Sequence, residues 1–321
     1  MPLMKSALYI IFERDKLTLY QYLYMLEERS CMSEYTVRVT VLGTRGSLPV
    51  SGKQTDDYGG ATSAYMMEAG GERLFIDGGT GILNAPKEPV SANAGKQPVR
   101  ILITHTHIDH ILGLPVFLLT YCAGRDVEFY GRTRSGETLE QQLHHLFHPP
   151  LWPAELKNYP MKNITFHEVE ECFQFGAFKI RVMESSHPGG SLIYRVDAAG
   201  KSVVFATDFE HGSGREEELA VFAEGADLLL YDGQYSETSE PYYESRKGFG
   251  HSTEEMGLKV LKSCGAKALR IIHHDPASTD DMLARREAQL ICRTGENDLK
   301  QDPQDRMPDI AFAREGETVE L

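Results

Sequence analysis

The sequence predicts an α/β protein built as a four-layer αββα sandwich, in which two β-sheets stack face to face and helices cover their outer faces. Three observations lead to this prediction. The 321 residues are 41% apolar and 25% charged, a composition that can bury a sizeable core. Strand patterns are followed by helical patterns in each half of the chain. This arrangement buries both faces of each sheet.

In the first half, strand patterns cover residues 35–42 and 99–104. Residues 64–68 and 73–76 flank a Gly-Gly pair, which predicts a hairpin because glycine adopts the positive φ of a tight turn. The run 99–104 is typical of a strand buried on both faces. The glycine-punctuated segment 43–60 is too long for a simple turn, so we expect it to be functional.

In the second half, four strand patterns cover residues 178–185, 191–197, 201–207 and 226–232. An Ala-Gly pair at residues 199–200 indicates a turn between two of them. A Ser-x-x-Glu spacing at Ser252 predicts a capping box and a helix over residues 253–264, which Gly265 ends. A Ser-x-x-Asp spacing starts another helix at Ser278.

The first 32 residues form a separate expectation. Residues 17–28 have an amphipathic helical pattern, but the core pattern begins only near Tyr35. We therefore expect residues 1–32 to be a peripheral extension of a domain that spans residues 33–321. The segment is interpreted as a peripheral helix, a dimer contact or an upstream extension from a misplaced start codon, and the last two are favoured over a catalytic role.

Charge and cysteine content restrict the partners and the compartment. The 47 acidic and 33 basic residues leave a formal charge of −14, which disfavours binding to long nucleic acids. The 5 cysteines are scattered without a C-x-x-C pair, which favours a reducing compartment, so we expect a cytoplasmic protein. No apolar run approaches the ~18 residues that span a bilayer, and we expect no membrane association.

The strongest chemical signal is His105-Thr106-His107-Ile108-Asp109-His110, directly after the strand pattern at residues 99–104. Neutral imidazole and carboxylate are ligands of zinc, manganese and iron. In a turning segment, His105 and His107 project to one side while Asp109 and His110 reach a second position, which suits two metal ions ~3.5 to 4 Å apart. A histidine-rich surface loop is the alternative, and it is disfavoured because four such side chains follow one buried strand.

The H-x-H-x-D-H motif, with Asp77-Gly78-Gly79 after the preceding hairpin, resembles the metallo-β-lactamase fold superfamily of metal-dependent hydrolases. That family's pattern asks for one more histidine, a bridging aspartate and a last histidine, each at a strand end. His187, Asp208 and His273 each follow a strand pattern in this order. The resemblance covers roughly residues 36 to 290 and implies the family's four-layer sandwich.

The resemblance also implies a ligand set for two metal ions, with zinc expected and manganese as the alternative. One ion would be held by His105, His107 and His187, and the other by Asp109, His110 and His273, with Asp208 bridging both. His273 is preferred to the adjacent His274, which is expected to be a supporting or substrate contact. Asp77 is implied to fix the tautomer of a ligand histidine, and a turn-forming role is the alternative.

Two further segments resemble the ribonuclease Z group of phosphodiesterases within this superfamily. Gly250-His251-Ser252-Thr253 is similar to the group's His-Ser-Thr loop, and Tyr231-Asp232-Gly233-Gln234 lies where the group carries an acidic segment. The similarity implies that His251 gives a proton to the leaving alkoxide and that Asp232 orients it. Asp109, His251 and Asp232 are thus the expected catalytic residues. For His251, a place ahead of the helix cap is the alternative.

The segments GTRGSLP, YGGATS, HPGGSLIYRV and HHDPASTDD look more like small bacterial phosphodiesterases of this superfamily, some acting on cyclic nucleotides, than like ribonuclease Z, because no basic arm is evident. We therefore expect a dinuclear phosphodiesterase acting on a small phosphodiester, with a 3′,5′-cyclic nucleotide as the leading candidate and, by analogy, a homodimer. A hydrolase of carboxylic esters, lactones or thioesters is the alternative enzyme. A metal-free binding protein is the alternative outside enzymes.

Two weaker candidates complete the analysis. Arg45, in the glycine-punctuated loop, is a candidate phosphate contact, with an ordinary turn as the alternative. Residues 142–156 hold three histidines, three prolines and the single tryptophan, Trp152, and are a candidate lid that could stack a base. For His144 and His145 solvated surface positions are favoured, while His148 and Trp152 are weak candidates for substrate contact.

Overall fold

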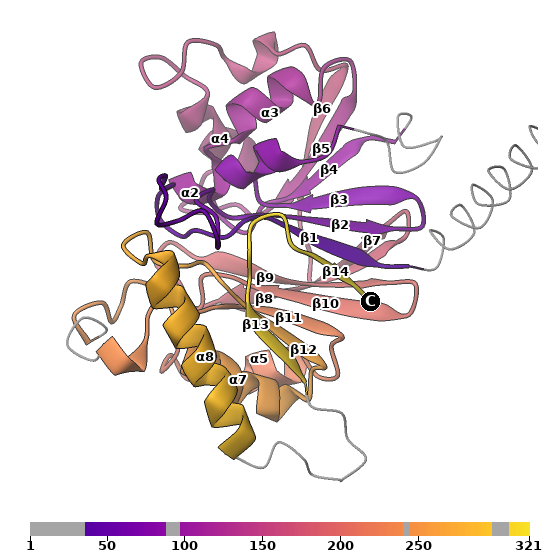
Figure 1. The fold of residues 1–321 in the computed structure, drawn as a ribbon. Coiled ribbons are helices and arrows are strands. Elements are labelled where there is room, and N and C mark those ends of the chain that lie inside the picture. The colour runs from indigo at the N-terminus through magenta and orange to yellow at the C-terminus, as the bar shows by residue number, and fades with distance from the viewer. Residues whose placement is uncertain (1–35, 88–96, 240–243, 297–307) are drawn as a thin grey trace, which may run out of the picture.

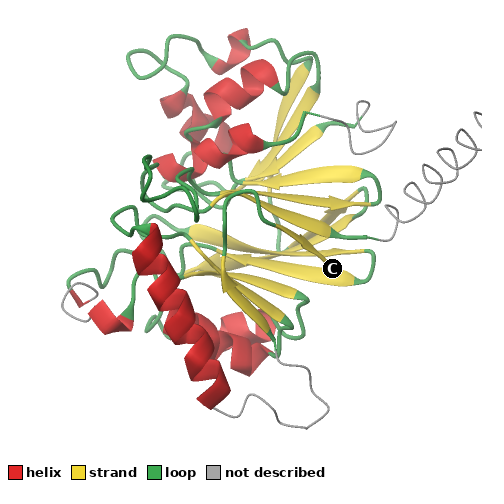
Figure 2. Ribbon diagram, in the orientation of Figure 1, coloured by secondary structure: helices red, strands yellow, loops and turns green. Residues whose placement is uncertain are grey.

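The computed structural model describes residues 36–87, 97–239, 244–296 and 308–321. Segment 1–32, with its expected amphipathic helix, lies outside the described residues. The described chain forms two seven-stranded sheets that lie face to face, with helices on the outer side of each (Figure 1, Figure 2). The predicted four-layer sandwich is confirmed.

The first sheet combines an antiparallel edge with a parallel half. Its strand order is β14-β1-β2-β3-β4-β5-β6, and β3 to β6 run parallel. β2 and β3 form the predicted hairpin around the Gly-Gly pair. The strands are β1 (Arg38–Gly43), β2 (Ala64–Ala69), β3 (Glu72–Ile76), β4 (Val99–Leu102), β5 (Asp126–Gly131), β6 (Asn163–Glu168) and β14 (Thr318–Glu320).

The second sheet has the same mixed character. Its order is β13-β12-β11-β10-β9-β8-β7, and β10 to β13 run parallel. The predicted turn between β9 and β10 is present, with Ala199 and Gly200 both at positive φ. The strands are β7 (Cys172–Phe175), β8 (Phe178–Ser185), β9 (Ser191–Ala198), β10 (Lys201–Ala206), β11 (Leu228–Asp232), β12 (Ala268–Ile272) and β13 (Asp309–Phe312).

Helices cover the outer faces of both sheets. α2 (Ile108–Ile111), α3 (Leu114–Thr120) and α4 (Leu139–Leu146) lie over the first sheet, and α5 (Glu216–Phe222), α7 (Glu254–Cys264) and α8 (Asp280–Glu296) lie over the second (Figure 1). Short 3₁₀ turns are η1 (Thr80–Asn84), η3 (Leu156–Asn158) and η4 (Glu237–Ser239).

The predicted helix starts are wrong by one residue. Thr253, not Ser252, caps α7, because its hydroxyl accepts the backbone N–H of Met256. The hydroxyl of Ser252 instead lies 2.8 Å from the hydroxyl of Tyr231. Likewise the hydroxyl of Thr279, not that of Ser278, accepts an N–H in the first turn of α8. Gly265 ends α7 in the left-handed conformation, as predicted.

Three apolar cores hold the four layers together. The central core lies between the sheets, and the outer cores lie between each sheet and its helices. Phe205 and Tyr65 meet across the two sheets with ring centroids 5.7 Å apart. Burial on both faces explains why inner strands such as β11 and β12 are near-continuous apolar runs. None of the described helices combines the length and the hydropathy needed to cross a bilayer.

Candidate metal centre

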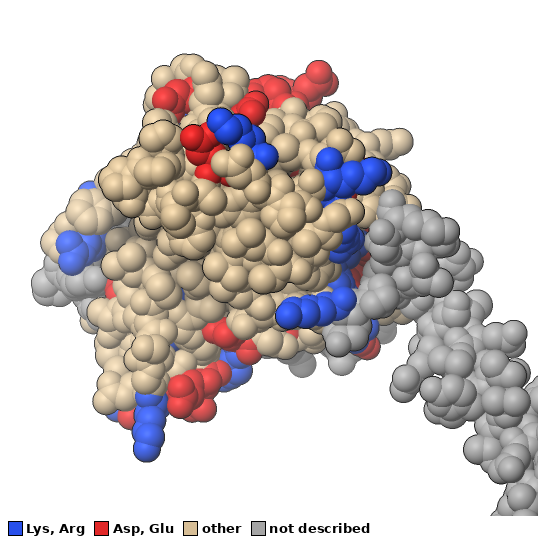
Figure 3. Space-filling model, turned by 90° about the horizontal axis from the view of Figure 1, so that it is seen from above, with Lys and Arg blue, Asp and Glu red and all other residues tan. Residues whose placement is uncertain are grey.

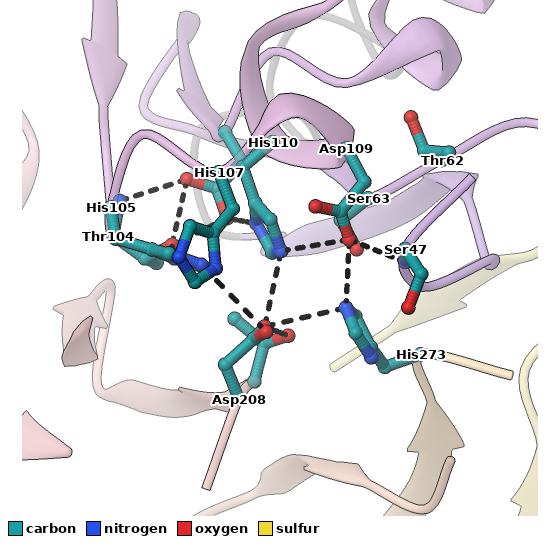
Figure 4. A network of polar contacts seen from close by, with 12 residues as sticks. Ser47, Thr62, Ser63, Thr104, His105, His107, Asp109, His110, Asp208 and His273 are labelled. Carbon is teal, nitrogen blue, oxygen red and sulfur yellow. Dashed lines mark hydrogen bonds and ion pairs between the residues drawn. The ribbon is translucent and has the colours of Figure 1, made fainter. Parts of the chain in front are cut away.

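The predicted site residues meet at one edge of the sandwich, where strands of both sheets end. Parallel strands present their carboxyl ends at the same edge of a sheet, and ligand sites form there. In the first sheet, the segment 105–110 follows β4 and Asp77 follows β3. In the second sheet, Asp208 follows β10, Asp232 ends β11 and His273 follows β12. Figure 4 shows side chains from the two sheets pointing toward one another.

Three histidines form the first ligand group, which consists of His105, His107 and His187. One ligand atom from each lies within 4.8 Å of the others. Nε2 of His187 lies 3.0 Å from Nδ1 of His107. The other ring nitrogen of His187 lies 3.0 Å from the carbonyl oxygen of Gly250. If Nδ1 donates to this carbonyl, Nε2 is left free to coordinate a cation.

The second ligand group consists of Asp109, His110 and His273, whose ligand atoms also lie within 4.8 Å of one another. Oδ2 of Asp109 lies 3.1 Å from Nε2 of His273 and 3.4 Å from Nε2 of His110. α2 begins at Ile108, so the chain turns between His107 and Asp109. That turn directs His105 and His107 to the first group and Asp109 and His110 to the second.

Asp208 lies between the two ligand groups (Figure 4). Its Oδ1 is 3.8 Å from Nε2 of His105, and its Oδ2 is 3.1 Å from Nε2 of His110 and 3.5 Å from Nε2 of His273. Asp208 is 1% exposed, so its charge is removed from solvent. A buried carboxylate needs compensating positive charge, and its two oxygens face different groups, as the bridging role requires.

Asp77 lies behind the second ligand group. Its Oδ2 is 2.7 Å from Nδ1 of His110, and its Oδ1 accepts the backbone N–H of Thr104 at 2.8 Å. The hydroxyl of Thr104 also donates to the same carboxylate. These bonds leave Nε2 of His110 facing Asp208. Asp77 thus makes the contact expected of a residue that fixes a ligand tautomer.

The electrostatics of the two ligand groups differ. Burial lowers the pKa of each imidazole in the first group, which favours the neutral form that binds metal ions. Burial also acts against charge on His110, but the carboxylates of Asp208, Asp109 and Asp77 outweigh it and raise its pKa well above the ordinary value. The pKa of His273 rises to about 9 for the same reason. The carboxylates of this site therefore stabilise positive charge placed among them.

The residues present fit divalent metal ions. Nε2 of His105 and Nε2 of His110 are buried and have no hydrogen-bond partner among the described residues. Leaving a buried polar atom unpaired costs about 1–3 kcal/mol. Imidazole nitrogen with carboxylate oxygen is a ligand set for zinc or manganese, and one such ion at each ligand group would satisfy these nitrogens.

His251 and Asp232 form a pair beside the ligand groups. Nδ1 of His251 lies 2.9 Å from Oδ2 of Asp232 and 3.8 Å from Oδ1 of Asp208. The ring of His251 stacks on that of His273, with centroids 4.8 Å apart, and meets Tyr235 edge to face. The side chain of His251 is 9% exposed. It is thus held between ligand residues and a buried carboxylate.

Two supporting residues were not predicted from the sequence. The backbone N–H of Ser47 donates to Oδ2 of Asp109 at 2.6 Å, in the loop singled out for its length. Oε2 of Glu210 accepts the N–H of Gly250 at 2.9 Å, one peptide unit before the carbonyl that meets His187. Neither residue carries a local motif. The glycine content of these loops is the one sequence feature that indicated close packing at the site. At Gly46, for example, a Cβ would lie 2.3 Å from the ring of His273.

The substrate contacts considered for Arg45 and His274 are not present. Arg45 is fully buried, and its guanidinium donates to the carbonyl oxygens of Gly59, Asp275 and Ser278, so it supports the loop and does not face a phosphate. His274 is also fully buried, which excludes the substrate contact considered for it. Its Nε2 lies 2.9 Å from the carbonyl oxygen of Ala313, and burial lowers its pKa to about 3.

The candidate lid gives a mixed result. Trp152 packs against the core between the first sheet and its helices, which accounts for its ring without a substrate. His144 and His145 are exposed, and Nε2 of His145 lies 3.0 Å from Glu137. Both histidines therefore occupy the solvated surface positions that the sequence favoured. Nδ1 of the exposed His148 lies 2.5 Å from the carbonyl oxygen of Pro149.

Known proteins support this architecture. Residues 72–274 match the beta-lactamase superfamily domain. Ribonuclease Z of Haloferax volcanii is 24% identical over 268 residues, which cover 78% of this chain and 75% of that protein. The probable metallo-hydrolase YhfI of Bacillus subtilis is 25% identical over 263 residues, which cover 79% of this chain and 93% of that protein.

Solved structures show the same fold. The metallo-beta-lactamase fold protein YhfI from Bacillus subtilis has a TM-score of 0.62 at 17% identity, covering 89% of this chain and 100% of that one. A diphosphatase from the PhnP family has a TM-score of 0.58 at 19% identity, covering 89% and 98%. The short form of human tRNase Z has a TM-score of 0.57 at 19% identity, covering 88% and 98%. Because the matched domain spans more than half of its 321 residues, the chain belongs to the beta-lactamase superfamily.

Proposed function

We propose that the protein is a dinuclear metal-dependent phosphodiesterase that hydrolyses a small phosphodiester, with 3′,5′-cyclic nucleotides as the leading candidates. One observation carries this proposal. Two ligand groups share the carboxylate of Asp208, and the His251–Asp232 pair lies directly beside that carboxylate. Such a site has the parts for displacement at phosphorus, with cations on one side and a proton donor on the other.

The two ions would be held by the two ligand groups, with Asp208 between them. The chemistry that divalent cations supply is Lewis acidity, which brings the pKa of water toward neutrality and neutralises charge on a phosphoryl oxygen. Asp77 keeps Nδ1 of His110 engaged, and the carbonyl of Gly250 does so for His187. These contacts hold each ligand ring in one orientation.

His251 would protonate the departing oxygen. When Nδ1 donates to Asp232, Nε2 is the nitrogen left to carry a proton to the substrate. A positioned acid of this kind contributes typically ~10² to 10⁴-fold in rate. Phosphodiesters of ribose or deoxyribose have alkoxide leaving groups that need this proton. Hydrolysis of a lactone or thioester needs no strong acid at this position.

The named relatives support a reaction at phosphorus. Two are called ribonuclease Z and tRNase Z, and a third is called a diphosphatase. The formal charge of −14 favours a small substrate over a long nucleic acid. On the face seen from above in Figure 3, Lys and Arg side chains stand apart and form no continuous basic strip among the described residues.

The test combines metal analysis with a substrate panel. Protein purified without chelator is analysed for metal, then assayed with bis(p-nitrophenyl) phosphate, 3′,5′-cyclic mononucleotides, linear dinucleotides, a lactone and a thioester. We expect two equivalents of metal and turnover of phosphodiesters, with chromatography identifying the products. Turnover of the lactone or thioester alone would replace this proposal with the alternative hydrolase. Less than one equivalent, not restored by zinc or manganese, would favour a binding protein.

A further inference from the structure

We propose that Arg286, on α8, is a positioning residue for the His251–Asp232 pair. This inference rests on the proposed role of His251 as proton donor. Arg286 lies outside residues 72–274, which match the superfamily domain, and it contacts neither His251 nor Asp232 directly. It acts on the two loops that carry them.

The first loop follows Asp232. β11 ends at Asp232, and the N–H of Gly233 makes one further bond, to the carbonyl oxygen of Ile272 at 3.0 Å, before the chain leaves the sheet. Nη2 of Arg286 donates to the carbonyl oxygen of Gly233 at 2.8 Å and to that of Tyr235 at 2.7 Å. These carbonyls are one and three residues beyond the carboxylate that meets His251. The guanidinium thus bridges the loop at the point where it leaves the sheet.

The second loop carries His251 into α7. The same guanidinium makes two hydrogen bonds to the carboxylate of Glu254, at 3.0 and 2.7 Å, in the first turn of α7. Glu254 is 3% exposed, so the ion pair is shielded from solvent. The N–H of Tyr235 also donates to the carbonyl oxygen of Ser252 at 3.0 Å, which joins the two loops next to His251.

Arg286 therefore connects the loop after Asp232 and the start of α7 after His251 through one rigid guanidinium. A guanidinium is planar and offers five donors in a fixed geometry, so its bonds to one loop fix the direction of its bonds to the other. Its side chain is 11% exposed, which limits competition from water. A shift of about 1 Å at a reacting group can cost ~10²-fold in rate. Loss of the hydrogen bonds that Arg286 makes to the two loops should therefore impair proton transfer by His251 while leaving the ligand groups in place.

The test uses the leaving group as its readout. A substrate with a p-nitrophenolate leaving group needs little protonation, whereas an alkyl leaving group needs a proton donor. For Arg286→Gln we expect kcat to fall ~10- to 100-fold with a 3′,5′-cyclic mononucleotide, and less than about 3-fold with bis(p-nitrophenyl) phosphate. His251→Ala should show the same selectivity more strongly. The double variant should lose little beyond His251→Ala, since both changes remove one function.

Matched controls separate this role from general destabilisation. Arg293 lies on the same helix as Arg286, and Arg293→Gln, which removes its ion pair with Glu255 of α7, should leave both activities unchanged. Arg286→Lys keeps the positive charge but loses the planar guanidinium and its several donors. Its kcat with the cyclic mononucleotide should fall between the values for wild type and Arg286→Gln, even if the latter folds poorly. Thermal denaturation and metal content are measured for each variant.

The outcomes distinguish the two proposals. If His251→Ala affects both substrates equally, the proton-donor role is wrong and the inference fails with it. If His251→Ala is selective but Arg286→Gln and Arg286→Lys lower both activities to the same extent, the role of His251 stands and the inference about Arg286 is overturned. Additive losses in the double variant would also overturn it.

Discussion

The two halves of the chain contribute to the site in different ways. The first half supplies His105, His107, Asp109 and His110 from six consecutive positions after one strand. The second half supplies single residues from the ends of separate strands, tens of positions apart. A local turn is enough to place the first set, whereas the second set depends on the pairing of β10, β11 and β12. The first contribution is therefore a sequence motif, and the second is a property of the sheet.

Backbone conformation shows what the two halves share. Of the six described non-glycine residues with positive φ, four lie at the site: Ser47, Asp77, Asp208 and His273. Such residues cost of order 1–3 kcal/mol each when the surroundings hold them there. Asp77 and His273 directly follow a strand, and Asp208 comes two residues after the end of β10, where the chain must turn sharply to direct a side chain across the edge of the sheet. Both halves thus use strained strand ends.

The largest effect is expected at Asp208, the residue of the second half that faces both ligand groups. Asp208→Ala should lower metal affinity and reduce phosphodiester turnover by on the order of a thousandfold or more, because the two proposed ions would both lose the shared carboxylate. Metal content after dialysis and kcat/KM with bis(p-nitrophenyl) phosphate measure this. Asp197→Ala, which removes a carboxylate of β9 that pairs with Arg181 and Arg195, is the matched control and should keep its metal. Full metal content in Asp208→Ala would contradict the bridging role.

The next effect separates chemistry from metal binding within the second half. His251→Ala should keep both metal ions and lose ~10²-fold or more in turnover of an alkyl phosphodiester. The reason is that His251 faces the ligand groups but bonds to Asp232. Metal analysis and product chromatography on the same preparation test this. Metal loss as large as that in Asp208→Ala would show that His251 is a ligand.

A smaller effect is expected behind the motif of the first half. Asp77→Asn should reduce metal affinity or activity ~10- to 100-fold, because a carboxamide accepts the bond from His110 less strongly than a carboxylate does. Competition of the protein with a chromophoric chelator gives the affinity. Thermal denaturation is the control for folding, since Asp77 also accepts two bonds from Thr104. Unchanged affinity in a folded variant would limit Asp77 to a turn-forming role.

The smallest effect concerns the link between the halves away from the metal centre. Glu287 of α8 accepts the hydroxyl of Tyr58 at 2.6 Å and pairs with Arg314 at 2.8 Å. Burial opposes ionisation of Glu287, but these bonds outweigh it and lower its pKa. A lowered carboxyl pKa adds stability above the unfolded-state pKa of about 4.3, and this stability is lost as the pH falls through the folded-state value.

Glu287→Gln should therefore reduce the free energy of unfolding by about 2 kcal/mol at pH 7. The difference from wild type should shrink below about pH 4.3, where the native carboxyl also takes up a proton. Urea titrations at several pH values measure this, and activity at neutral pH should be nearly unchanged. A difference that is constant with pH would show that packing, and not charge, is what the substitution removes.

Sequence reasoning failed where a side chain's role depends on residues far along the chain. Arg45 lies in a glycine-rich loop, as a phosphate contact would, yet its donors are used by carbonyl oxygens from loops about 14 and 230 residues away. His273 and His274 are adjacent and chemically identical. Only the exit from β12 determines that one meets Asp109 while the other meets Ala313. The helix caps were misplaced by one residue because two neighbouring hydroxyls could each have capped.

The sequence by itself determined the layers, most of the strands, the superfamily and the H-x-H-x-D-H segment, because these depend on local periodicity and on residues close together in the chain. Only the tertiary structure decided which distant residues support the site. Ser47 behind Asp109, Glu210 behind Gly250 and Arg286 across the loops of Asp232 and His251 are set by the packing of strand ends and helices. The physical reason is that a hydrogen bond constrains atoms in space, whatever their separation along the chain.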